Sequence, residues 1–162
     1  MTEGFVEETK IKYDDYYKIA EKTKCFNEEE LDALDGALDS WYWGEDDEYR
    51  LVEVREDSKI IGFTVFGRAP LSKLCWDIYW VVVRVNKQKN GYGKQLLKMV
   101  EENILGENKY AVLRIETSSR DIYAPARKLY ESCGFKQECV IGDYFDIGDS
   151  LMVFFKHVGK IN

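Results

Sequence analysis

The chain has 162 residues, of which 45% are hydrophobic and only two are proline, a composition that excludes disorder and predicts a single domain spanning residues 1–162. The net charge of −7 argues against nucleic acid as a partner, because binding phosphates requires a cationic face. No apolar run reaches transmembrane length and the first residues lack a signal-peptide pattern, so we expect a soluble, cytoplasmic protein without membrane association.

The first quarter of the chain is expected to hold a short strand and two helices. Residues 5–9 are compatible with the strand, and aromatic residues recur at helical spacing over residues 13–24, which predicts an amphipathic helix. Asn27 is followed by three glutamates, a pattern typical of a helix start. We expect the second helix to run from there to about Trp41.

The pattern then changes to that of strands. Residues 49–56 and 59–69 are rich in β-formers and are joined by a hairpin signal at residues 57–59. Residues 74–85 form a third, longer run with a continuous apolar stretch. Such a stretch is typical of a strand at the centre of a sheet, covered on both faces.

The second half alternates helices and strands and ends in a strand pair. The expected elements are a helix at 91–106, a strand at 109–117, a helix at 125–133, and strands at 135–141 and 150–158 around a loop at 142–149. The whole order predicts an α/β (α+β) fold with a mixed sheet and helices on both faces.

The sequence contains few residues that could form a metal site or a catalytic triad. The four cysteines are widely spaced without a Cys-x-x-Cys pair, and His157 is the single histidine. We therefore expect reduced, inert cysteines, no metal site and no Ser-His-Asp triad.

Residues 21–48 hold eleven acidic residues against two lysines. This segment indicates either a solvated face or an electrostatic field that attracts a cationic amine.

The turn between the third strand and the next helix has features of an anion-binding site. Gly91 and Gly93 allow close approach of a ligand to the backbone, Lys89 and Lys94 add positive charge, and N–H groups at a helix start point outward. A simple tight turn explains the glycines equally well. The pattern lacks the final Lys-Ser/Thr of a nucleotide-hydrolysing loop and the third glycine of a dinucleotide-binding fingerprint.

Two motifs in this order resemble the GNAT N-acetyltransferase superfamily over nearly the whole chain. Residues 88–93 (QKNGYG) are similar to its acyl-CoA signature Gln/Arg-x-x-Gly-x-Gly/Ala, and residues 126–135 (ARKLYESCGF) are similar to a later family segment. The resemblance implies a single-domain, mostly antiparallel sheet with a central splay in which CoA lies. It also implies transfer of an acetyl group from acetyl-CoA to a primary amine of a small molecule or protein.

The resemblance assigns the cofactor residues. It implies that backbone groups of Val81 and Val83 bind pantetheine and that N–H groups of residues 88–94 bind the pyrophosphate. The full set is Val81, Val83, Gln88, Lys89, Asn90, Gly91, Tyr92, Gly93, Lys94, Tyr123 and Arg127. Tyr123 stands where the family commonly has Asn, so the resemblance leaves its contact with CoA open.

Catalytic roles also follow from the resemblance. The Val81 N–H matches the oxyanion donor, and Tyr130 matches the tyrosine that protonates the CoA thiolate. Asp77 is the first candidate for the general base. Glu116, a water molecule and the absence of a dedicated base remain alternatives, and each carboxylate is also compatible with a structural role.

The loop at 142–149 places Asp143, Tyr144 and Phe145 where the family shapes its acceptor pocket, and Glu116 is counted with them. An aromatic pair with an acid suits an amine attached to an apolar group, but the rings also suit a cover for the sheet edge. A non-catalytic acyl-CoA-binding module and an interaction module with an acidic face are the other functions considered. The chain is expected to be a monomer or a homodimer.

Overall fold

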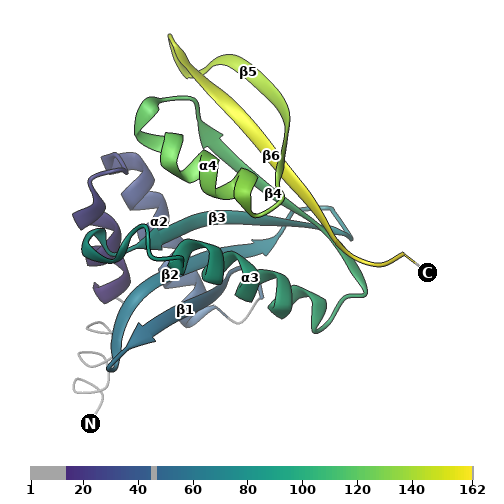
Figure 1. Cartoon of the computed structure of the whole chain (residues 1–162), viewed down its shortest axis with the longest axis horizontal. Helices are drawn as coiled ribbons and strands as arrows, with labels where there is room; N and C mark the ends of the chain where they lie inside the picture. Colours follow the sequence, from purple (N-terminus) through teal and green to yellow (C-terminus); the bar gives the residue numbers. More distant parts are fainter. Residues whose placement is uncertain (1–13, 45–46, 162) are drawn as a thin grey trace. The chain divides into compact units, whose positions relative to one another are not determined.

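A computed structural model describes residues 14–44 and 47–161 of the chain. The strands among these residues form a six-stranded sheet in the order β1-β2-β3-β4-β6-β5, in which β3 and β4 are parallel while β4–β6 and β5–β6 are antiparallel (Figure 1). The predicted mixed, mostly antiparallel α/β fold is therefore confirmed. The strand expected at residues 5–9 lies outside the described residues.

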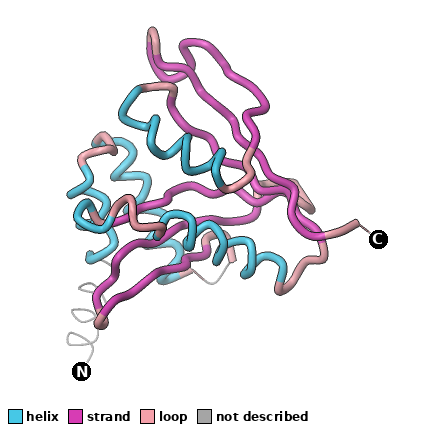
Figure 2. The backbone as a smooth tube through the Cα atoms, viewed as in Figure 1, coloured by secondary structure: helices cyan, strands magenta, loops and turns pink. Residues whose placement is uncertain are grey.

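The elements follow the predicted order. After a helix over residues 14–23 come α2 (Glu28–Trp43), β1 (Arg50–Glu56), β2 (Lys59–Arg68), β3 (Cys75–Val83), η1 (Val85–Lys87), α3 (Tyr92–Leu105), β4 (Tyr110–Ser118), η2 (Asp121–Tyr123), α4 (Ala124–Ser132), β5 (Lys136–Asp146) and β6 (Asp149–Gly159) (Figure 2). β3 lies between β2 and β4, which confirms its predicted central position.

Two compact units make up the chain. One comprises residues 1–65 and 80–96, and the other comprises residues 66–79 and 97–162. The single-domain organisation and the central splay of the sheet involve both units and stay predictions. Among the described helices, none is long and apolar enough to cross a membrane.

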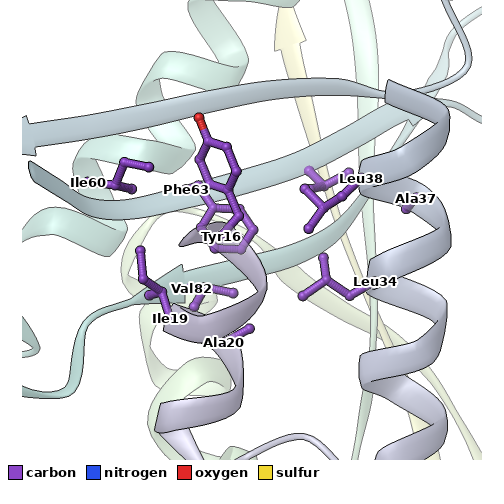
Figure 3. Close-up of a cluster of buried hydrophobic side chains, with 10 residues drawn as sticks. Tyr16, Ile19, Ala20, Leu34, Ala37, Leu38, Ile60, Phe63 and Val82 are labelled. Carbon is purple, nitrogen blue, oxygen red and sulfur yellow. The ribbon is translucent and has the colours of Figure 1, made fainter. Parts of the chain in front are cut away.

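The first unit has its core between the two N-terminal helices and the strands. Tyr16, from the helix over residues 14–23, and Leu38, from α2, pack with Phe63 of β2 in one buried cluster (Figure 3). Asn27 begins α2 as predicted: its side chain accepts a hydrogen bond from the Glu30 N–H at 2.8 Å, and the Glu30 carboxylate accepts one from the Asn27 N–H at 2.8 Å. This reciprocal capping satisfies two N–H groups of the first turn.

The hairpin between β1 and β2 turns where the sequence indicates. Asp57 and Ser58 have φ values of 46° and 68°. Positive φ at both central residues matches the right-handed twist of the flanking strands, so a two-residue turn suffices. The Arg55 side chain adds a hydrogen bond of 2.9 Å from Nη1 to the Ser58 carbonyl.

Gly62 in β2 marks a close approach of two strands. A Cβ at this position would lie 2.6 Å from the Val82 carbonyl oxygen and 3.2 Å from Leu96 Cδ1. Since a backbone oxygen cannot move away cheaply, we expect Gly62→Ala to lower the free energy of unfolding by about 1–3 kcal/mol in urea titrations. Gly36 of α2, whose Cβ would meet nothing within 4 Å, supplies the control. Gly36→Ala should stabilise by about 0.5–1 kcal/mol, and equal effects of the two changes would contradict this account.

The second unit is built on β4 and β6. Their antiparallel pairing runs from Tyr110 with Gly159 to Ser118 with Leu151. Helix α4 packs on this part through Tyr130, whose ring lies edge-on against Phe154 of β6 with centroids 5.9 Å apart. The helix ends at Ser132, and Gly134, just after the C-cap residue Cys133, has a φ of 88°, the conformation that glycine tolerates best.

The loop predicted at residues 142–149 is wrong: β5 continues to Asp146, and the turn occupies only residues 147–148. Gly142 and Asp143 resemble turn residues, but the hairpin closes later, at Gly148, which has a φ of 81° and whose N–H donates to Asp143 Oδ1 at 2.8 Å. Between two paired positions β5 advances from Ile141 to Asp146 while β6 covers only residues 149–151. The extra residues make β5 bow away from β6 (Figures 1 and 2).

Candidate functional site

The predicted anion site of the first unit is the connection between β3 and α3. After the single 3₁₀ turn η1 the chain has positive φ at Lys89 (62°) and Gly91 (84°), and α3 begins at Tyr92. The Gly91 carbonyl accepts the Gln95 N–H at 3.0 Å, so Gly91 occupies the position just before the helix. The positive φ values at Lys89 and Gly91 turn the backbone into the start of α3.

Side chains of the connection hold its own backbone. Gln88 Nε2 donates to the Val83 carbonyl at 3.2 Å, and Asn90 Nδ2 donates to the Lys87 and Gln88 carbonyls at 3.2 and 3.0 Å. The two polar residues predicted to touch the cofactor thus shape the loop.

Glu56, at the end of β1, anchors the same connection. Its carboxylate receives the Lys87 ammonium and the Tyr92 hydroxyl. The Tyr92 side chain is therefore held by Glu56 through its hydroxyl, and Tyr92 can bind a ligand only through its backbone N–H. The sequence analysis missed Glu56, which is separated from these partners by more than thirty residues and follows no motif.

Backbone donors remain at the start of α3. Helix geometry leaves the first N–H groups, those of Tyr92, Gly93 and Lys94, without a partner inside the helix. The Gln88 N–H, in contrast, is already directed at the Val85 carbonyl at 3.4 Å. A Cβ added to Gly91 would meet nothing within 4 Å, so the space beside the connection is open.

Positive charge accompanies these donors. Lys89 and Lys94 are exposed, and no described residue forms an ion pair with either. Lys87 differs from them because Glu56 neutralises it. The connection can therefore offer a bound anion helix-start N–H groups and two lysines that are not already paired.

β3 carries one residue more than β2 between two hydrogen bonds that join these strands. The Ala69 N–H donates to the Cys75 carbonyl at 2.9 Å, and the Arg84 N–H donates to the Ile61 carbonyl at 2.9 Å. β2 advances eight residues from Ile61 to Ala69, while β3 advances nine from Cys75 to Arg84. An extra residue leaves backbone groups of the longer strand outside the ladder, as a strand needs if its N–H is to bind a ligand.

In the second unit Asp77 forms a fork-shaped ion pair with Arg114. Asp77 stands opposite Arg114 in the parallel pairing of β3 and β4, and its exposed fraction is 7%. Arg114 Nε lies 2.6 Å from Oδ1 and Nη2 lies 2.9 Å from Oδ2. The hydrogen bond to Asp77 raises the pKa of Arg114. Both carboxylate oxygens of the first candidate base are thus occupied by a cation.

Glu116, the competing base, lies next to this pair. Its Oε1 is 3.6 Å from Arg114 Nη1, and its side chain is half exposed. The nearby Cys75 thiol has its pKa raised, first by burial and then by Asp77, which keeps it neutral and unreactive. Asp77, Arg114 and Glu116 form one charged group on β3 and β4. The sequence analysis considered the two carboxylates as separate candidates and missed Arg114.

Tyr130 is deeply placed in the second unit. Its exposed fraction is 7%, and burial raises its pKa from 10 to about 12. Its ring contacts Phe154 and Phe135, and within the described residues no group hydrogen-bonds its hydroxyl. The phenol therefore stays protonated across the neutral range.

The remaining predicted residues lie in the second unit with local partners. Tyr123 is buried, with the Arg120 guanidinium 5.4 Å from its ring centroid. Arg127 Nη1 donates to the Ser118 and Arg120 carbonyls at 2.7 and 2.9 Å. Tyr144 and Phe145 lie in the bowed part of β5 with exposed fractions of 56% and 52%.

No group of three or more potential metal-ligating side chains occurs in residues 14–44 and 47–161. The four cysteines are free thiols. Some acids expected to form a field have local partners instead: Glu30 caps α2, and Asp47 pairs with Arg50. Asp46 lies outside the described residues.

The mixed sheet with a glycine-bearing helix start after its central strand fits the acetyltransferase class that the sequence motifs resemble. The family model described as the acetyltransferase (GNAT) family matches residues 13–135. The chain belongs to this family and is an N-acetyltransferase. GNAT acetyltransferases use acetyl-CoA and act on amine acceptors.

Solved structures agree with this assignment. A GNAT-family protein from Desulfovibrio desulfuricans is 29% identical, with 89% of this chain and 91% of that chain covered and a TM-score of 0.82. An aminoglycoside 6'-N-acetyltransferase complexed with coenzyme A is 14% identical (93% of each chain, TM-score 0.72). The ribosomal-protein-S18-alanine N-acetyltransferase from Escherichia coli is 16% identical (77% and 79%, TM-score 0.63). No curated protein matches the sequence.

Proposed function

We propose that the protein transfers an acetyl group directly from acetyl-CoA to a primary amine. The observation that carries the proposal is the start of α3, where Gly91 turns the chain beside open space and the first N–H groups have no partner inside the helix. Lys89 and Lys94 lie in the same segment and form no ion pair with any described residue. Such a site suits the pyrophosphate of CoA. A non-catalytic module would need no buried proton donor, and Tyr130 therefore favours an enzyme. Calorimetric titration with acetyl-CoA tests the binding step.

The same chemistry assigns roles to residues of both strands and helices. Val81 and Val83 bind pantetheine through their backbone, and the N–H of Val81 stabilises the oxyanion formed when the amine attacks the thioester carbonyl. The carbon–sulfur bond then breaks, and Tyr130 donates its phenolic proton to the departing thiolate. The proton lost by the amine goes to a carboxylate.

Glu116 is the better candidate for this carboxylate. Asp77 is buried, and both of its oxygens accept hydrogen bonds from Arg114, so protonation would break a buried ion pair. Glu116 is half exposed and is held only at 3.6 Å by the same arginine. Asp77 then acts by fixing Arg114 and, through it, the orientation of Glu116.

This division of roles predicts different losses for two variants. Glu116→Gln should lower kcat/KM by about a hundredfold with little change in thermal stability, because the base is gone. Asp77→Asn should lose thermal stability, because it leaves Arg114 without its partner. The measurement is kcat/KM beside thermal unfolding. Near wild-type kcat/KM in Glu116→Gln, together with a loss of about a hundredfold in a stably folded Asp77→Asn, would return the role of base to Asp77.

For the acceptor, we propose an amine attached to an apolar group. Tyr144 and Phe145 offer exposed rings 4.9 Å apart, and Asp143 lies beside them in the bowed part of β5. Aromatic rings next to a carboxylate suit an ammonium carried on an apolar body. Similar folds belong to aminoglycoside and ribosomal-protein acetyltransferases, which places both small-molecule and peptide amines in the panel to be tested.

A further inference from the structure

Arg127 makes contacts that differ from those of a phosphate ligand. It lies one turn before Tyr130 on α4, near the N-terminal end of that helix. A cation at this end is disfavoured by the helix dipole and therefore needs compensation. Two carbonyls supply it: Nη1 donates to Ser118 at 2.7 Å and to Arg120 at 2.9 Å. One guanidinium nitrogen thus bridges the end of β4 and the connection that follows.

The same connection is held from the other side by the start of β6. The Asp149 carboxylate, with 14% of its side chain exposed, accepts the Ser118 hydroxyl and lies 3.3 Å from Arg120 Nε. The Arg120 N–H donates to Ser118 Oγ at 3.0 Å.

Two further hydrogen bonds reinforce this side. The Ser119 N–H donates to the Ser150 carbonyl at 2.9 Å, and the Ser150 N–H donates to Ser119 Oγ at 2.8 Å. The connection from Ser119 to Tyr123 is therefore tied both to α4 and to β6.

We propose that Arg127 and Asp149 are positioning residues: together they clamp the connection and fix α4, and with it the Tyr130 phenol, on the strands. Because a displaced proton donor loses its alignment with the leaving group, loosening the clamp lowers turnover more than cofactor affinity. The effect on turnover rests on the proposed role of Tyr130. The effect on the fold of the connection does not.

The test compares Arg127→Met with Lys128→Met, which removes one positive charge from the neighbouring, exposed position of α4. Native-state hydrogen exchange of residues 119–130 should accelerate by about tenfold or more in Arg127→Met and in Asp149→Asn, and should not change in Lys128→Met. In Arg127→Met kcat should fall by about tenfold to a hundredfold. Calorimetric Kd values for acetyl-CoA should stay within about threefold of wild type. Arg127→Lys should recover part of the lost protection.

Two results would overturn the proposal. The first is unchanged exchange in Arg127→Met and Asp149→Asn. The second is a Kd for CoA that rises about tenfold or more in Arg127→Met together with loss of discrimination between CoA and 3′-dephospho-CoA, which would make Arg127 a phosphate ligand. If exchange accelerates in the two variants but the wild-type protein acetylates no amine, the result counts against the proposed function and leaves the proposed clamp standing.

Discussion

Replacing Tyr130 by phenylalanine is expected to lower kcat by about a hundredfold or more while leaving the protein folded, because general acid catalysis typically contributes at least that factor. No described residue hydrogen-bonds the hydroxyl, so its removal leaves no buried partner unsatisfied. The ring contacts with Phe154 and Phe135 are kept. Steady-state kinetics with an accepted amine, beside calorimetric titration of acetyl-CoA, measure the two effects separately.

The pH dependence refines this expectation. Since burial raises the pKa of Tyr130 to about 12, the phenol remains protonated throughout the neutral range, and deprotonation of Tyr130 should not limit wild-type activity at or below pH 9. A change confined to KM in Tyr130→Phe would mean that the ring only positions the substrate. A kcat equal to that of wild type with intact binding would remove Tyr130 from the mechanism and assign proton delivery to water.

The second large effect is expected at the start of α3. Gly91→Val combined with Gly93→Val should weaken acetyl-CoA binding by about a hundredfold or more, because each lost hydrogen bond to a charged group contributes about 1.5–3 kcal/mol. Two causes must be separated, since Gly91 has a φ of 84° and a β-branched residue is strained there whatever the ligand.

Gly91→Asn separates them. Asparagine tolerates positive φ, so the backbone keeps its turn. Its side chain enters the open space beside Gly91, where the anion is proposed to bind. Weak binding by a stable Gly91→Asn variant would support direct contact with the pyrophosphate. Calorimetry that gives wild-type affinity for a folded double variant would contradict the assignment of the site.

Local signals account for what the sequence predicted correctly. Three local signals act within a few positions of themselves: Asn27 with Glu30, the turn residues 57–58, and Gly91 just before α3. Each element begins or ends where they indicate. The positions of the strands along the chain followed from hydrophobic runs whose lengths are typical of buried or half-buried strands.

Partners far apart in the sequence could not be predicted in this way. The pairing of Asp77 with Arg114 depends on the register of two parallel strands, and the bonds of Glu56 with Lys87 and Tyr92 depend on how β1 meets the connection. The wrong loop has a local cause: Gly142 and Asp143 carry a turn signal, while the hairpin closes at Gly148.

Release of the CoA thiol in the presence of amines tests the central claim most directly. The protein should be incubated with acetyl-CoA and a panel comprising an aminoglycoside, a peptide with an N-terminal alanine, an arylalkylamine and a polyamine. We expect thiol release that depends on at least one amine, with one acetylated product per thiol, and strongest with an amine on an apolar group. Tight acetyl-CoA binding without amine-dependent thiol release from any member would contradict the proposed transfer to an amine.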